Sequence, residues 1–382
     1  KIMILIKNVD VYSPKHIGRK DVLICAEKIT LIEDNIKLDN DKIIVIDGNN
    51  KILVPGFIDQ HVHITGGGGE GSFKTRVPEI MLSKLTSSGI TTVVGLLGTD
   101  ATTRSVENLV SKAKALKEEG ISVYVHTGSY EYPTVTLTES VRKDIAFVDE
   151  IIGCKIAVSD HRSSTLTNEE LQRVASDVRV AGMISGKAGI LICHMGDGKR
   201  GLNPINEVLN NSDIPIRTIR PTHVNRNKSL LEQGFEYAKM GGIIDLTCGI
   251  YDELSPRKVI KQAIEKEVPI ENLTISSDGY GSWSNYDEYG NLIKIGVSSV
   301  NALYKEFRAM VLEEKMNIED ALTYVTSNVA KALELYPKKG AIKENSDGDL
   351  ILLDENLDID TVIARGRLMV ENKEVKVFGT YE

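Results

Sequence analysis

From residue 56 onward, short apolar runs alternate with longer amphipathic stretches. We interpret the apolar runs as strands at 57–63, 90–96, 121–127, 151–158, 189–194, 216–222, 242–248 and 273–277. The intervening stretches have helical spacing, as in 105–120, where five apolar side chains share one face and a glycine ends the pattern (Val106, Leu109, Val110, Ala113, Leu116 and Gly120). Eight successive strand–helix units predict an α/β fold, a (β/α)8 TIM-like barrel. A doubly wound open sheet is the alternative.

Both ends of the chain have a different pattern, in which apolar and polar residues alternate with a period of two. Such segments occur at 2–13, 20–34 and 42–56, and again at 348–358 and 360–375, where "ENKE" predicts a hairpin turn. We therefore expect a small β-sandwich domain formed from both chain ends, residues 1–55 and 342–382. Residues 56–341 would then form the barrel.

Composition narrows the class of protein. The chain has 382 residues, 41% of them hydrophobic, and its 46 basic and 54 acidic residues give a net charge of −8. No basic run that would bind nucleic acid occurs. No apolar run approaches the roughly 18 residues of a membrane span, and no signal peptide is visible. The cysteines form no CxxC pair, and we interpret them as reduced thiols of a cytoplasmic protein.

Ionisable residues stand at the carboxyl ends of the predicted barrel strands, where the active sites of such barrels lie. His61 and His63 are two residues apart on a strand and therefore share a face, as half of a metal site would require. The alternative to a metal site is that one of these two histidines is buried in the core and the other is exposed. The later strand ends add His194, His223 and Asp278. Their convergence predicts a metal centre.

Lys155 lies in the middle of the apolar run "IIGCKIAV". Burial would lower its pKa and leave a nucleophilic amine, which can take up CO2 to form an anionic carbamate that bridges two metals. A lysine that reaches solvent from a strand edge is the alternative. Among the other histidines, His16 is expected at the surface, while His126 and His161 are expected near the barrel rim in a supporting role.

The order of these residues along the chain resembles that of the binuclear amidohydrolase superfamily. It consists of HxH after the first strand, a lysine after the fourth, histidines after the fifth and sixth, and an aspartate after the eighth. Within the superfamily, "PGFIDQHVHITGGGGEG", "KIAVSDHRSS", "HMGDG", "PTHVNR" and "SSDGYGS" resemble the isoaspartyl dipeptidase (β-aspartyl peptidase) family over the whole chain. The resemblance implies two Zn2+ per subunit, bridged by carboxylated Lys155 and a hydroxide. His61 and His63 would bind one zinc, and Asp278 would bind the same ion. His194 and His223 would bind the other zinc.

The resemblance also implies a substrate site beside the metals. Glu70, at the end of the glycine run, would hold the substrate ammonium, although a solvated loop acid is the alternative. Arg162 and Arg226 can bind carboxylates through two hydrogen bonds each. Hydroxyl groups would come from Thr99 and Ser282.

Asp278 and Tyr130 are the expected catalytic residues. Asp278 would take a proton from the attacking hydroxide and deliver it to the leaving amine. The phenol of Tyr130 would stabilise the oxyanion, and on sequence grounds Tyr132 competes for that role.

The implied function is zinc-dependent hydrolysis of the isopeptide bond of β-aspartyl dipeptides through a metal-bridging hydroxide. The resemblance further implies a cytoplasmic homo-oligomer such as an octamer. One alternative is a cyclic amidase of the dihydroorotase or hydantoinase type. Dihydroorotases carry HxHxR at the first strand, where this chain has Thr65. A metal-free scaffold homologue is a further alternative.

Overall fold

All eight predicted barrel strands are present in the computed structural model, which describes residues 3–38 and 40–382. They are β6 (Phe57–Val62), β7 (Ile90–Gly95), β8 (Ser122–Gly128), β9 (Ile151–Val158), β10 (Ile190–Met195), β11 (Ile219–Thr222), β12 (Ile244–Thr247) and β13 (Leu273–Ser276). The strands pair in chain order, and a parallel bridge between Val62 and Gly279 joins the last strand to the first. This closure gives a barrel and excludes the doubly wound sheet, because strand order reverses at a switch point in a doubly wound sheet.

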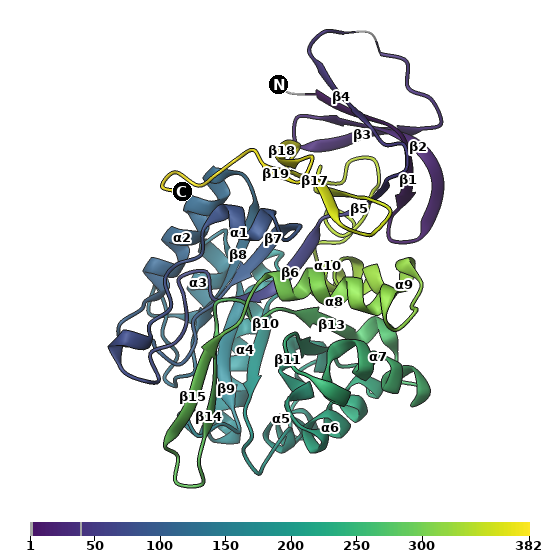
Figure 1. Ribbon diagram of the computed structural model, residues 1–382. Helices are drawn as coiled ribbons and strands as arrows, with labels where there is room; N and C mark the ends of the chain where they lie inside the picture. The colour runs from purple at the N-terminus through teal and green to yellow at the C-terminus, as the bar shows by residue number, and fades with distance from the viewer. Residues whose placement is uncertain (1–2, 39) are drawn as a thin grey trace.

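Helices surround the barrel (Figure 1). They are α1 (Leu82–Thr86), α2 (Val106–Glu119), α3 (Val141–Phe147), α4 (Asn168–Ser185), α5 (Asn203–Asn210), α6 (Lys228–Lys239), α7 (Pro256–Glu265), α8 (Asn301–Leu312), α9 (Ile318–Thr323) and α10 (Ser327–Ala332). In α2 the Ser105 side chain caps the amino end, and Gly120, at φ 128°, ends the helix as predicted. In the described part of the chain, no helix is both long and apolar enough to cross a membrane.

The amino end of the barrel is plugged by apolar side chains. Val329 and Ala330 of α10 pack in one cluster with Ile58, Ile152 and Ile190, which stand at the starts of their strands. A site is therefore expected at the opposite end, the carboxyl end of the strands, where the hairpin of β14 (Ser282–Tyr286) and β15 (Leu292–Val297) follows the last barrel strand.

The two chain ends meet in a second, nine-stranded sheet, seen in Figure 1 as purple and yellow strands side by side. The first segment supplies β1 (Met3–Tyr12), β2 (His16–Cys25), β3 (Lys28–Glu33), β4 (Ile43–Asp47) and β5 (Ile52–Pro55), and the last supplies β16 (Leu350–Leu353), β17 (Ile359–Ala364), β18 (Arg367–Glu371) and β19 (Glu374–Val375). β5 pairs with β16, so the sheet depends on both ends. The first half of β1 pairs with β4 and the second half with β5, around a shared apolar core.

This arrangement confirms the predicted fold class, a barrel with a β-sandwich from both ends. The "ENKE" hairpin is also present, since β18 and β19 pair through Glu371 and Glu374. The residues between them, Asn372 and Lys373, have φ values of 51° and 68°, as a tight two-residue turn requires. The boundaries 1–55, 56–341 and 342–382 stay a prediction.

Candidate active site

Buried imidazoles converge at the carboxyl end of the barrel. The ring centroids of His61 and His223 are 4.9 Å apart, and those of His194 and His223 are 4.7 Å apart. Ligand atoms of His61, His223 and Asp278 all lie within 4.8 Å of one another. An oxygen of Asp278 is also 3.2 Å from Nε2 of His63. The structure thus brings all five predicted strand-end residues to one place.

The backbone is strained where two of these side chains leave their strands. His223 and Asp278 have φ values of 62° and 52°, the left-handed region that non-glycine residues seldom adopt. Nδ1 of His223 is 2.6 Å from Oγ1 of Thr247, which fixes the ring orientation. Left-handed residues of this kind concentrate at functional sites, because the surrounding fold has to hold them there.

Glycines allow the His63 ring to sit deep in the site. A Cβ at Gly98 or at Gly281 would lie 2.9 Å from a carbon of this imidazole, and a Cβ at Gly67 would lie 3.3 Å from its Nδ1. A side chain at Gly98 or Gly281 would displace the ring, and one at Gly67 would crowd it. Within the glycine run only Gly67 lies against the ring, and the other two glycines come from the loops that follow β7 and β13.

Lys155 is fully buried in β9, with its Nζ 3.2 Å from Nε2 of His61. Burial lowers the pKa of its amine to about 7. A substantial neutral fraction at physiological pH follows, which is the form that reacts with CO2. The alternative of a solvent-reaching lysine is wrong.

The donor set fits a zinc-type centre. Burial lowers the pKa of His61, His194 and His223 well below the ordinary value, so these rings are neutral and present lone pairs. Burial would raise the pKa of Asp278, but the polar groups of His223, His63 and Lys155 that face it lower it to about 2, so it is an anion. Lone pairs and an anion that converge in a buried space are stabilised by a bound cation, and imidazole with carboxylate is a zinc-type ligand set.

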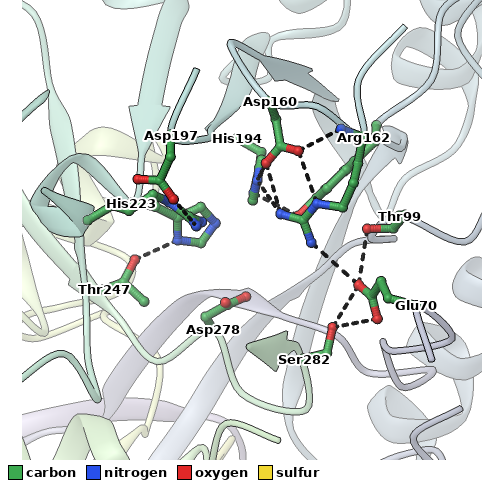
Figure 2. Close-up of polar contacts among 12 residues, drawn as sticks. Glu70, Thr99, Asp160, Arg162, His194, Asp197, His223, Thr247, Asp278 and Ser282 are labelled. Carbon is green, nitrogen blue, oxygen red and sulfur yellow. Dashed lines mark hydrogen bonds and ion pairs between the residues drawn. The ribbon is translucent and has the colours of Figure 1, made fainter. Parts of the chain in front are cut away.

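Glu70 lies beside this cluster as the centre of a polar group (Figure 2). Its carboxylate accepts hydrogen bonds from Ser282 at 2.8 and 2.9 Å and from Thr99 at 3.2 Å, and lies 3.5 Å from Arg162. Only 6% of its side chain is exposed. Glu70 is therefore a buried, positioned anion and no solvated loop acid.

Both predicted arginines already contact carboxylates. Arg162 donates two side-chain hydrogen bonds to Asp160, at 3.0 and 2.8 Å. Its guanidinium also lies over the rings of Tyr130 and Tyr286, at 5.3 and 6.0 Å from their centroids. Arg226 lies 3.6 Å from the exposed Asp197. Arg162 is thus rigidly held deep in the site, whereas Arg226 lies nearer its mouth.

Tyr130 and Tyr132 are separated by the fold. The hydroxyl of Tyr130 is 2.8 Å from Nδ1 of His194, and burial raises its pKa, so the phenol remains a proton donor. The backbone N–H of Tyr132 instead bonds to Ser164 at 2.9 Å. Only Tyr130 is brought against the histidine cluster.

The sequence analysis missed two supporting residues. Asp160 contacts both Arg162 and His194, and its signal was its place in "SDHR" at a strand end. Arg104 donates hydrogen bonds to the carbonyls of Thr65, Gly67 and Val77 and so holds the glycine loop, which no local pattern indicates.

The glycine run also matches the G-x-G-x-x-G spacing of dinucleotide-binding turns. It leads into the 3-10 turn η1 (Phe73–Thr75) and not into a long helix. The helix N-terminus that binds a pyrophosphate is therefore missing from this described segment.

The remaining histidines have unequal settings. His16 is exposed, as predicted, and lies 2.6 Å from Asp10. His161 is exposed and packs against Tyr286. His126 is fully buried within β8, where its ring packs against Gly153, so it lies deeper in the barrel wall than the expected rim position.

Comparison with known proteins places the chain in a family. The model of the amidohydrolase family matches residues 52–196 and 215–369. A β-aspartyl dipeptidase of Fervidobacterium islandicum AW-1, solved in complex with β-Asp-Leu, is 44% identical, with a TM-score of 0.93 over 98% of this chain and 99% of that chain.

More distant similarities are informative only for the fold. A 5′-deoxyadenosine deaminase of Methanosphaera stadtmanae is 23% identical over 97% of this chain and 94% of its own length. A D-hydantoinase structure is 19% identical, with a TM-score of 0.70, and the match covers 99% of this chain and 97% of that one. The chain therefore belongs to the amidohydrolase family, and within this family it is similar to the β-aspartyl dipeptidases.

Proposed function

We propose that this protein is a zinc-dependent dipeptidase that hydrolyses the isopeptide bond of β-aspartyl dipeptides in the cytoplasm. The observation that carries the proposal is the opposed pair of Glu70 and Arg162 beside the histidine cluster, 3.5 Å apart. A β-aspartyl residue exposes a free α-ammonium and an α-carboxylate, and an anion and a cation at this spacing match both. The 44% identity to a β-aspartyl dipeptidase solved with β-Asp-Leu supports the same substrate class.

His61, His63 and Asp278 would hold one zinc ion, and His194 and His223 would hold the other. Carboxylated Lys155 would be a ligand shared by the two ions. When bound, the ions supply an activated water at neutral pH and polarise the scissile carbonyl. This ligand set also separates the proposal from a metal-free scaffold, which would need no such convergence of lone pairs.

The protein's own groups divide the remaining work. Asp278, ionised at neutral pH, accepts the proton of the attacking water and passes it to the leaving amine. Tyr130, protonated because burial raises its pKa, donates a hydrogen bond to the oxygen of the scissile carbonyl. Arg162 and Arg226 bind the substrate carboxylates, and Arg226 is the better placed for that of the leaving residue, since it lies nearer the mouth.

The test is hydrolysis of β-Asp-Leu, α-Asp-Leu and dihydroorotate by purified, zinc-loaded protein. We expect β-Asp-Leu to be cleaved at least a hundredfold faster than α-Asp-Leu, because a site built around polar partners rejects substrates that misplace them by far more than an apolar pocket does. Preferred turnover of dihydroorotate would make the cyclic amidase the correct assignment. Zinc content by mass spectrometry would test the scaffold alternative.

A further inference from the structure

Asp160 occupies a point where the substrate side and the metal side of the site meet. Its side chain is buried, with 3% of its surface exposed, in the loop that follows β9. Oδ1 accepts hydrogen bonds from the backbone N–H and Nε of Arg162, at 2.8 and 3.0 Å. Oδ2 lies 2.8 Å from Nη2 of Arg162 and 2.9 Å from Nε2 of His194 (Figure 2). One carboxylate therefore holds a substrate-binding arginine and a predicted metal ligand at once.

The contact decides which nitrogen of His194 carries a proton. A carboxylate only accepts hydrogen bonds, so Nε2 must be the protonated nitrogen. Nδ1 then keeps its lone pair, and in this structure it faces the hydroxyl of Tyr130 at 2.8 Å. Nη2 of Arg162 also lies 3.4 Å from Nε2. With Nε2 protonated, both nitrogens are donors, so this longer contact is not a hydrogen bond. The arginine and the histidine are joined through the carboxylate of Asp160.

The two loops that carry these residues are locked together. A Cβ at Gly196, two residues after His194, would lie 2.5 Å from Cβ of Asp160. The backbone N–H of Gly198 donates to the carbonyl of Ser159 at 2.7 Å. The close approach of the loop after β10 to the loop after β9 therefore fixes the distance between carboxylate and imidazole.

We propose that Asp160 is a positioning residue that orients His194 for zinc through Nδ1 and simultaneously fixes Arg162 for the substrate carboxylate, so that metal retention and substrate binding share one anchor. The inference rests on the zinc-dependent dipeptidase proposed above. Carboxylate partners of metal-binding histidines of this kind change metal affinity by about 10- to 100-fold when removed.

Two substitutions separate this role from a purely structural one. In Asp160→Asn, an amide oxygen can still accept from the backbone of Arg162 and so keeps the loop turn. Its NH2 group faces Nε2 of His194 and favours the tautomer with the proton on Nδ1, which removes the ligand lone pair. Asp160→Ala loses the loop turn but leaves the tautomer unconstrained. We therefore expect Asp160→Asn to be the more damaging for zinc, whereas a loop-supporting role predicts that Asp160→Ala is.

The experiment is chelator competition for zinc, with melting temperature as the check on folding. Wild type, Asp160→Asn, Asp160→Ala and Arg162→Lys are compared. We expect Asp160→Asn to bind zinc about 10- to 100-fold more weakly than wild type, and Asp160→Ala to lose less zinc affinity than Asp160→Asn. Arg162→Lys should bind zinc like wild type but have a raised KM for β-Asp-Leu. Wild-type zinc affinity in Asp160→Asn, or a greater loss in Asp160→Ala, overturns the proposal.

A measurement on the wild-type protein covers the case in which the variants do not fold. Nitrogen NMR of metal-free protein labelled in histidine should show His194 protonated at Nε2, and protonation at Nδ1 would overturn the inference. None of the zinc or NMR readouts uses substrate. Failure to cleave β-Asp-Leu would therefore refute the proposed function while leaving these results to decide the role of Asp160.

Discussion

The role of Glu70 can be tested by changing the enzyme and the substrate together. Glu70→Gln removes the charge but keeps the size of the side chain, and N-acetylation of β-Asp-Leu removes the ammonium that we pair with it. A hydrogen bond between charged partners in a buried setting contributes about 1.5–3 kcal/mol. No discount for solvent is needed, because only 6% of the Glu70 side chain is exposed. At 1.36 kcal/mol per tenfold, each single change should lower kcat/KM by about 10- to 150-fold.

The assay is a four-way cycle of kcat/KM for wild type and Glu70→Gln, each with the free and the acetylated dipeptide. If Glu70 binds the ammonium, the two losses are not additive, since the second change removes a partner already lost. Acetylation of the dipeptide should then lower the kcat/KM of Glu70→Gln several-fold at most. Equal acetylation penalties in both proteins would refute the pairing.

Two controls accompany the cycle. Zinc content should be the same in wild type and Glu70→Gln, because Glu70 contacts Ser282, Thr99 and Arg162 and none of the predicted ligands. Glu79→Gln is the matched control variant. Glu79 follows the same loop in the chain, and its partly exposed carboxylate lies 3.6 Å from Nζ of Lys112. This variant should leave all four rates unchanged.

Three further predictions follow from the site and the fold. Lys155→Ala should lose most bound zinc and activity, and added formate or acetate should restore part of both by supplying the missing anion; full zinc occupancy in this variant would contradict a bridging role. Asp278→Asn should keep the fold but lose about 10²–10⁴-fold in kcat, and a loss of only a few-fold would rule out the proton-transfer role. Glu150→Gln should lower the free energy of unfolding by about 1 kcal/mol at pH 7, since Lys114 and Lys117, at 2.8 and 3.2 Å, are about half exposed. Burial would raise the pKa of Glu150, but these lysines hold it below its ordinary value, so the stabilisation is present above the unfolded pKa and is lost as pH falls through the folded one. In urea unfolding, the difference between the two proteins should begin to shrink as pH falls below about 4.3, the ordinary glutamate pKa. A difference that does not shrink as the pH is lowered further would contradict the charge pairing.

Much of the fold could be predicted because it is recorded locally. Each barrel strand is an apolar run between turn residues, since both of its faces are buried, and the face of α2 repeats at helical spacing. The errors in the predicted strands lie at their boundaries. Residues 216–218, predicted as strand, form a 3-10 turn (η2, Ile216–Thr218) before β11, because a local turn at a strand entrance leaves the apolar pattern unchanged.

The meeting of ionisable residues at the strand ends could also be predicted from the sequence, but only by residue type and order. Parallel strands in a barrel end at the same rim, so His61, Lys155, His194 and Asp278 had to approach one another once the strands were assigned. Which side chains form pairs is a different matter. It depends on distances between loops that are far apart in the chain.

Only the tertiary structure decided those pairs. It selected Tyr130 over Tyr132 because the chain turns between them, and it buried Glu70 against Ser282, 212 residues away. It also placed Asp160 between Arg162 and His194, a contact that depends on two loops packed through Gly196. Spacing along the chain determines which face a residue occupies, whereas hydrogen bonds across a site depend on packing to within a fraction of an ångström, and no local pattern records that.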